Sequence, residues 1–211
     1  MRIIITGGAG FLGSHIAEEA IKKKYRVVIV DKVINHKIQN KNISYIKTDI
    51  CDEKKLIKII KKNDIIYHLA AISDINEASL NSVKTVNDNI LATVKLLEIC
   101  RIKKIKKFIF GSSIYVHSSI GGYYRISKKS SELFVEEISK NSGFKFVILR
   151  FGSVYGPRQS LKNNISKIIH TALAKKKLVY SGSKKSIRKF VYVKDVAKIS
   201  LKIINNQYDN K

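Results

Sequence analysis

The sequence is poor in cysteine, proline, tryptophan and acidic residues, and each shortage excludes a class of protein. Its two cysteines, Cys51 and Cys100, are too few for a disulfide framework or a zinc knuckle, so we expect ordinary thiols in a reducing compartment. A single proline among 211 residues, of which 45% are hydrophobic, excludes collagen-like and disordered chains. No run approaches the roughly 18 apolar residues of a membrane span, and the N-terminal segment lacks the apolar core of a secretion signal. These absences predict a soluble cytoplasmic protein with no membrane partner.

The shortage of acidic residues leaves a formal net charge of +25, from 41 Lys and Arg against 16 Asp and Glu. Such a charge can indicate nucleic-acid binding. Here 34 of the basic residues are lysines and they are scattered, and in segment 53–62 they surround an apolar helical face. Nucleic-acid readers more often gather arginines and aromatic residues on one face. A nucleic-acid partner is therefore a remote alternative, and the charge is expected to attract anionic small molecules by long-range steering.

Apolar runs of strand length alternate with amphipathic stretches of helix length in the first 150 residues. The expected strands are 2–6, 26–30, 43–47, 65–69, 107–111 and 145–149, and the expected helices lie near 11–23, 53–62, 80–103 and 124–141. Runs rich in isoleucine, valine and phenylalanine predict strands that are buried on both faces. The alternation therefore predicts an α/β fold, a doubly wound parallel sheet of the Rossmann type, over residues 1–150.

The rhythm changes after residue 150. A Gly-Pro turn, a helix near 164–176, a short strand at 189–193 and a last helix from Asp195 are expected there. We therefore treat residues 151–211 as a separate region.

A glycine-rich turn, TGGAGFLG, joins the first expected strand to the first expected helix. Its glycines Gly7, Gly10 and Gly13 recur every third residue. A dinucleotide pyrophosphate needs such a tight turn, a backbone without Cβ at the closest approach, and the N–H groups of a helix N-terminus. Asp31 follows 18 residues after Gly13, at the end of the second strand, where a carboxylate binds ribose hydroxyls and repels a 2′-phosphate. NAD is therefore the predicted cofactor, in preference to NADP.

Tyr124 and Lys128 have the spacing Tyr-x-x-x-Lys at the start of an expected helix, so their side chains share a face. A free tyrosine has a pKa of about 10. A fixed ammonium and a positive nicotinamide would stabilise the phenolate, which makes Tyr124 a candidate general base. Ser113, after the fifth strand, would hydrogen-bond the substrate oxygen. Tyr123 is excluded because Ser127, not a lysine, stands four residues later.

Together these motifs resemble those of the extended short-chain dehydrogenase/reductases, the NAD-dependent epimerase/dehydratase family. Further segments that are similar to the family follow in order: Asp49-Ile50, HLAA at 68–71, NILAT at 89–93 with Ala92 in place of glycine, RFGSVYGPRQ at 150–159 and RKFVYVKDV at 188–196. The resemblance implies cofactor contacts by Gly7, Gly10, Phe11, Leu12, Gly13, Asp31, Asp49, Ile50, Leu69, Ala70, Ala71, Asn89, Tyr124 and Lys128. It implies catalysis by Ser113, Tyr124 and Lys128, and substrate contacts by Ser113, Ser153, Arg158 and Arg188.

The reaction that the resemblance implies is oxidation of a sugar carbinol by NAD followed by reduction from the other face. The family's dehydratases and decarboxylases place acidic residues directly after the catalytic serine or threonine, where this chain has Ile114 and Tyr115. A 4-epimerase acting on a UDP-sugar is therefore the favoured function. A nucleotide-sugar reductase or dehydrogenase, and an NAD-binding module with little turnover, remain alternatives. A homodimer is expected, with a nucleotide-sugar as substrate and no metal site.

Three departures from the family pattern bear on the substrate half. Only ten residues separate Ser113 from Tyr124, so the loop that normally lies over the substrate is short. Ser153 stands where many relatives have an asparagine, and a hydroxyl offers fewer hydrogen bonds than an amide. The chain ends shortly after the 188–196 segment, whereas the relatives that it resembles run on. The resemblance therefore implies that residues 151–211 are a short, apparently truncated substrate-binding region, either cut short or completed by a partner chain. His68, beside the cofactor-lining segment, is expected to pack against backbone rather than to act in catalysis.

Overall fold

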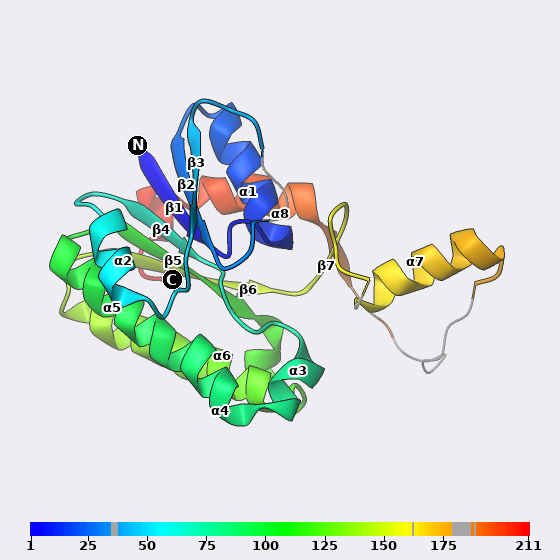
Figure 1. Cartoon of the computed structure of the whole chain (residues 1–211). Helices are drawn as coiled ribbons and strands as arrows, with labels where there is room; N and C mark the ends of the chain where they lie inside the picture. The colour runs from blue at the N-terminus through cyan, green and yellow to red at the C-terminus, as the bar shows by residue number, and fades with distance from the viewer. Residues whose placement is uncertain (35–37, 162, 179–186, 188) are drawn as a thin grey trace.

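The computed structural model describes residues 1–34, 38–161, 163–178, 187 and 189–211 (Figure 1). Its main sheet has six parallel strands in the order β3-β2-β1-β4-β5-β6. The strands are β1 Arg2–Thr6, β2 Arg26–Asp31, β3 Ile43–Lys47, β4 Ile65–His68, β5 Lys107–Ser113 and β6 Lys145–Phe151. This order reverses between β1 and β4, which creates a crevice at the carboxyl ends of these strands. The predicted doubly wound Rossmann sheet is confirmed.

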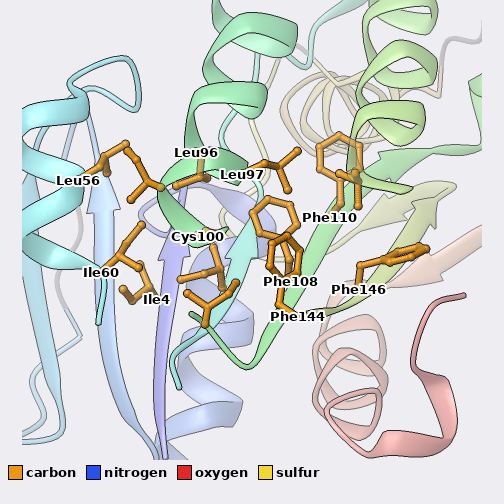
Figure 2. Close-up of a cluster of buried hydrophobic side chains, with 14 of the residues drawn as sticks. Ile4, Leu56, Ile60, Leu96, Leu97, Cys100, Phe108, Phe110, Phe144 and Phe146 are labelled. Carbon is orange, nitrogen blue, oxygen red and sulfur yellow. The ribbon is translucent and has the colours of Figure 1, made fainter. Parts of the chain in front are cut away.

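Side chains of the central strands alternate between two cores, one on each face of the sheet. Ile4 and Ile66 enter the first core together with Phe108, whereas Ile3 and Ile65 enter the second. Figure 2 shows the first core, where the strand residues meet leucines and isoleucines of the covering helices. Because both faces are covered, these strands contain continuous apolar runs rather than apolar residues at alternate positions.

Helices cover both faces of the sheet. The helices α1 Phe11–Lys22 and α8 Val193–Lys202 pack on each other over one face, and α2 Glu53–Ile59, α5 Ala92–Lys103 and α6 Gly122–Lys140 cover the other. The crossover from β5 to β6 runs through α6, which places the start of α6 near the carboxyl end of β5. Within the described part of the chain, no helix is both long and apolar enough to cross a membrane.

The single helix predicted over 80–103 is wrong. The structure has α3 Ile75–Leu80, α4 Ser82–Thr85, a π-helical turn Val86–Leu91 and then α5. Asn81 interrupts the pattern because its side-chain oxygen accepts a hydrogen bond from the Lys84 N–H, which caps a new helix start. The π-helical turn ends where the Ala92 N–H donates to the Asn87 carbonyl, five residues back. Such one-residue insertions in a helix are frequent at functional sites.

The residues after β6 form a smaller unit. β7 Ser153–Tyr155 and β8 Phe190–Tyr192 make a two-stranded parallel sheet. Helix α7, Asn164–Lys175, projects away from the main sheet (Figure 1). The last residues return to the main sheet, where the Asn210 N–H donates to the Phe146 carbonyl on β6 and the Ile148 N–H donates to the carbonyl of Lys211.

Candidate active site

The glycine turn lies at the carboxyl end of β1, pressed against the chain that leaves β4. Gly7 has a φ of +69°, and a Cβ there would lie 2.7 Å from the Ala70 nitrogen. A Cβ on Gly13 would lie 2.4 Å from the Gly7 carbonyl oxygen, inside the turn itself. Phe11 and Leu12 open helix α1, so their N–H groups have no carbonyl within the helix to bind. The turn therefore forms a Cβ-free cradle that is lined by N–H donors, which suits a pyrophosphate.

Asp31 at the end of β2 is held beside this turn. Its carboxylate accepts hydrogen bonds from the Ala9 N–H at 3.0 Å and from the Val33 N–H at 3.3 Å. Each carboxylate oxygen can accept a further bond, so the residue can both fix the turn and bind a hydroxyl.

Asp49 and Ile50 follow β3 on the same edge of the sheet. The Asp49 carboxylate accepts from the Cys51 N–H at 2.9 Å and pairs with the Lys32 ammonium at 3.0 Å. Partial burial opposes ionisation, but these two partners outweigh it and lower the pKa of Asp49. Lys32 also lies 3.4 Å from Asp88 at the π-helical turn. Sequence reasoning missed this ion-pair cluster, because its members come from three separate segments.

The segment after β4 lines the other side of the crevice. The Leu69 N–H donates to the Thr6 carbonyl at 3.0 Å, which continues the β1–β4 pairing by one residue. Ala70 then passes directly over Gly7, and Ala71 follows half-buried.

Asn89 lies between this segment and helix α6. Its Oδ1 accepts from the Ile72 N–H at 2.7 Å, and its Nδ2 donates to the Ile72 carbonyl and to Ser127 Oγ. Protein groups thus engage both ends of the amide. A contact between Asn89 and a cofactor stays a prediction.

Ser113, Tyr124 and Lys128 are buried together where β5 ends and α6 begins. Tyr124 is 9% exposed, whereas the neighbouring Tyr123 is 48% exposed and faces solvent. Burial raises the pKa of Tyr124, and the hydrogen bond with Ser113 opposes that rise. Burial lowers the pKa of Lys128 to about 8, with the Glu132 carboxylate acting in the opposite direction.

The ammonium of Lys128 is directed toward β5. It donates to the Gly111 carbonyl at 2.7 Å and lies 4.7 Å from the centre of the Phe110 ring. Ser113 Oγ accepts from the Tyr115 N–H at 3.3 Å, so its hydroxyl proton can be donated to Tyr124, as here, or to a substrate oxygen. The site thus joins a phenol, an ammonium and a hydroxyl donor, the groups needed to move a proton at a sugar hydroxyl.

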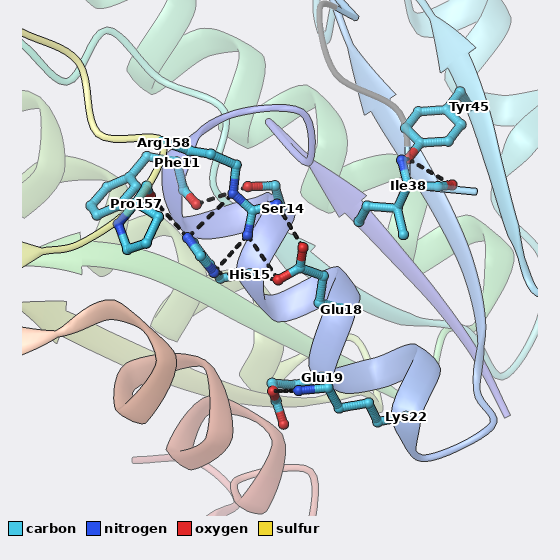
Figure 3. Close-up of polar contacts among 10 residues, drawn as sticks. All are labelled: Phe11, Ser14, His15, Glu18, Glu19, Lys22, Ile38, Tyr45, Pro157 and Arg158. Atoms are coloured by element: carbon cyan, nitrogen blue, oxygen red, sulfur yellow. Dashed lines mark hydrogen bonds and ion pairs between the residues drawn. The ribbon is translucent and has the colours of Figure 1, made fainter. Parts of the chain in front are cut away.

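The residues predicted to contact substrate are more dispersed. Ser153 is half-buried on β7. Arg158, with a φ of +67°, reaches back to α1, where its guanidinium binds both carboxylate oxygens of Glu18 at 2.7 and 2.8 Å and lies 2.6 Å from His15 Nδ1 (Figure 3). His15 Nε2 in turn lies 3.0 Å from the carbonyl of Pro157. Arg188 lies outside the described residues.

Nothing in the sequence alone indicated the contact between Arg158 and α1, although His15 and Glu18 stand three residues apart on one face of that helix.

Comparison with known proteins places the chain in a family. The model of the NAD dependent epimerase/dehydratase family matches residues 3–211. The chain belongs to that family. Among similar family members, the putative UDP-glucose 4-epimerase of Methanocaldococcus jannaschii is 32% identical over 96% of this chain and 73% of its own length. A dTDP-D-glucose 4,6-dehydratase of Dictyostelium discoideum is 31% identical over 92% of this chain, but this chain spans only 53% of it.

Solved structures of the family agree with this fold. A UDP-N-acetylglucosamine 4-epimerase from Methanobrevibacter ruminantium, in complex with UDP-N-acetylmuramic acid, is 31% identical and gives a TM-score of 0.86, covering 95% of this chain and 71% of that one. The UDP-glucose 4-epimerase of Thermus thermophilus, in complex with NAD, is 27% identical with a TM-score of 0.83, covering 96% and 74%. The chain thus spans about half to three quarters of the length of these relatives.

Proposed function

We propose that the chain is an NAD-dependent epimerase, a 4-epimerase that acts on a UDP-sugar, with residues 1–150 binding NAD and residues 151–211 forming part of the substrate region. This proposal rests on one observation. Tyr124 and Lys128 are buried beside Ser113, at the same edge of the sheet as the glycine turn. The epimerases that were solved with a UDP-sugar or NAD support the choice of both ligands.

The residues present fit NAD: the shape of the glycine turn suits a pyrophosphate, and the carboxylate of Asp31 suits ribose hydroxyls. The N–H groups of the glycine turn would hold the pyrophosphate, and Asp31 would bind the adenosine ribose. When bound, NAD would supply the hydride acceptor and a positive charge. Lys128, with a pKa of about 8, is largely protonated at neutral pH and would stabilise the Tyr124 phenolate. Tyr124 would then accept the proton of the sugar hydroxyl while Ser113 donates a hydrogen bond to the same oxygen.

The residues that follow Ser113 support epimerisation over water or carbon dioxide loss. Removal of water needs a further acid and base at the site, and Ile114 and Tyr115 stand at the positions where the resemblance to dehydratases and decarboxylases would require carboxyl groups. Dehydratases belong to the same family, so family membership does not distinguish them from epimerases. The distinction rests on Ile114 and Tyr115.

A second candidate is an NAD-binding module with little turnover, since the glycine turn would bind NAD whether or not a sugar is converted. The chain spans 53% of the dehydratase and 73% of the Methanocaldococcus epimerase. A reductase of the same family would release its cofactor in each turnover, whereas an epimerase regenerates NAD in place.

We further propose a cytoplasmic homodimer that pairs through α5 and α6. Large apolar side chains are exposed on and beside these helices, among them Leu91, Ile126, Leu133 and Phe134. An exposed apolar face of this kind favours association with a partner surface.

Incubation of the purified protein with UDP-glucose and UDP-N-acetylglucosamine, after analysis of its heat-released small molecules, tests the function. We expect bound NAD and interconversion with the galacto epimers. Tyr124→Phe removes the proton acceptor and should lower kcat at least about 1000-fold. Tyr123→Phe, the same change on the exposed neighbour, should leave kcat within about twofold. Bound NAD without turnover in the wild type would favour the binding module, and absence of NAD binding would contradict both.

A further inference from the structure

A fully buried histidine lies next to the candidate site. His68, the last residue of β4, is 1% exposed, and its imidazole packs against the rings of Phe108 and Phe110. Its Nδ1 lies 2.7 Å from Thr6 Oγ1 and its Nε2 lies 2.9 Å from Thr93 Oγ1. The expectation that His68 packs against backbone is therefore wrong, because both ring nitrogens meet threonine hydroxyls.

The hydrogen bonds of Thr93 determine which nitrogen of His68 carries the proton. Thr93 Oγ1 donates its only proton to the Asn89 carbonyl at 2.6 Å, so toward His68 it can only accept. His68 Nε2 is then the donor, and Nδ1 accepts the proton of the Thr6 hydroxyl. Burial lowers the pKa of His68 to about 3, and the positive charge of Lys128 acts in the same direction. The imidazole is therefore neutral, with its proton on Nε2.

The chain of hydrogen bonds continues from Thr93 into the catalytic helix α6. The Asn89 carbonyl, which accepts from Thr93, also accepts from Ser131 Oγ at 2.9 Å. The Asn89 side chain donates to Ser127 Oγ at 2.9 Å, and that hydroxyl donates to the Tyr124 carbonyl at 2.9 Å. All of these side chains except Tyr124, which is 9% exposed, are essentially excluded from solvent, so water does not compete for the bonds.

We propose that His68 is a positioning residue that fixes the glycine turn relative to the catalytic face of α6. One end of its chain of bonds is Thr6, which directly precedes Gly7, and the other end is the first turn of α6, which carries Tyr124. This inference rests on the proposed function. Hydride transfer requires the cofactor, held by the turn, and the base, held by α6, at a fixed separation. A displacement of about 1 Å can cost on the order of 100-fold in rate.

Three substitutions separate the two bonds of the imidazole. His68→Asn keeps an acceptor near Thr6 but cannot reach Thr93, whereas His68→Gln can reach Thr93 but loses the acceptor for Thr6. Thr93→Val removes the hydroxyl at nearly constant shape. We expect His68→Asn and Thr93→Val to lower kcat by roughly 10- to 100-fold with KM and the Kd of NAD changed less than about threefold, and His68→Gln to retain more activity.

Tyr67→Phe is the matched control. Tyr67 precedes His68 on β4, and its buried hydroxyl donates to the Ser200 carbonyl at 2.6 Å on the opposite face of the sheet. This variant loses one buried hydrogen bond of the same strand but none of the bonds that lead to α6, so we expect its kcat to be unchanged. Equal losses of kcat in Tyr67→Phe and Thr93→Val, or an unchanged kcat in Thr93→Val, would overturn the positioning role.

A second measurement judges the proposal without turnover. NMR of ¹⁵N-histidine-labelled protein, assigned with His68→Asn, should show the Nε2–H tautomer of His68 and no titration between pH 5 and pH 8. Amide hydrogen exchange over 124–128 should be faster in Thr93→Val than in Tyr67→Phe. The Nδ1–H tautomer, or unchanged exchange, would contradict the network. If the wild type binds NAD but converts no UDP-sugar, the proposed function fails. The tautomer of His68 and the amide exchange over 124–128 still test the hydrogen-bond network in that case.

Discussion

The two regions of this molecule differ in how they are held together. Residues 1–150 contain two apolar cores and the candidate active site, whose side chains hydrogen-bond to one another. The described residues after 150 instead pack largely against the first region. Ala197 and Leu201 of α8 enter the core beside α1, while the projecting helix α7 leaves Ile169 and Leu173 exposed. The described helices after residue 150 therefore differ in packing, since α8 contributes to a core of the main sheet and α7 does not.

A substitution in the glycine turn should have the largest effect on the stability and the NAD affinity of the first region. In Gly13→Ala the new Cβ would lie 2.4 Å from the Gly7 carbonyl oxygen, and backbone on both sides leaves little room to move. We expect the free energy of unfolding to fall by about 3 kcal/mol and the Kd of NAD to rise by roughly 100-fold or more. Denaturant unfolding and isothermal titration calorimetry measure these two quantities.

Gly152→Ala is the matched control in the second region. A Cβ there would lie 3.8 Å from Ile114, an ordinary contact, so both quantities should stay near wild type. A tolerant Gly13 would show that the turn is looser than the structure indicates.

The attachment of α8 depends on a buried lysine. Lys107 is 1% exposed at the start of β5, where its ammonium donates to the Ile204 carbonyl at 2.7 Å and pairs with Asp209 at 2.5 Å. Lys107→Met removes a charge that faces a carboxylate and the carbonyls at the end of α8, so we expect a loss of about 3 kcal/mol in the free energy of unfolding. The exposed Lys106→Met should cost less than about 0.5 kcal/mol. In Lys107→Met, amide hydrogen exchange should show that residues 193–211 open before the strands of the main sheet. Simultaneous opening of both would contradict the anchoring of α8 by Lys107.

The contact between Arg158 and α1 is the weaker anchor. Arg158→Lys loses the two-pronged bond to Glu18, and because both side chains are partly exposed we expect only about 1 kcal/mol. The control Arg101→Lys, in the exposed pair with Glu98, should be neutral within about 0.3 kcal/mol in thermal unfolding.

The same anchor has a pH dependence. Burial, then the Arg158 charge, lowers the pKa of His15, although the Pro157 carbonyl opposes this. Since the folded pKa lies below the ordinary 6.5, the contribution of His15 to stability is full above pH 6.5 and is lost as the pH falls. The difference in stability between wild type and Arg158→Lys should therefore shrink below pH 6.5, and a difference that grows on acidification would contradict the neutral His15.

Sequence alone predicted the sheet and the glycine turn because each rests on local chemistry. The strands are continuous apolar runs, and Gly7 and Gly13 occupy positions where a Cβ has no space. The break at Asn81 and the π-helical turn escaped prediction, since the apolar spacing continues through them. The partners of Arg158 and His68 also escaped it. A motif gives the position of a residue in the chain, whereas the groups that it meets come from segments more than 20 residues away.

The π-helical turn at Val86–Leu91 also sets the angular phase between the two ends of one continuous helical stretch. An α-helix advances about 100° per residue, so the extra residue decides which side of α5 faces α6. Deleting one residue here would rotate Thr93 away from His68 without changing the composition of either helix. Tolerance to single-residue deletions should therefore be lowest at this turn, although its side chains Val86 and Leu91 are themselves exposed to solvent.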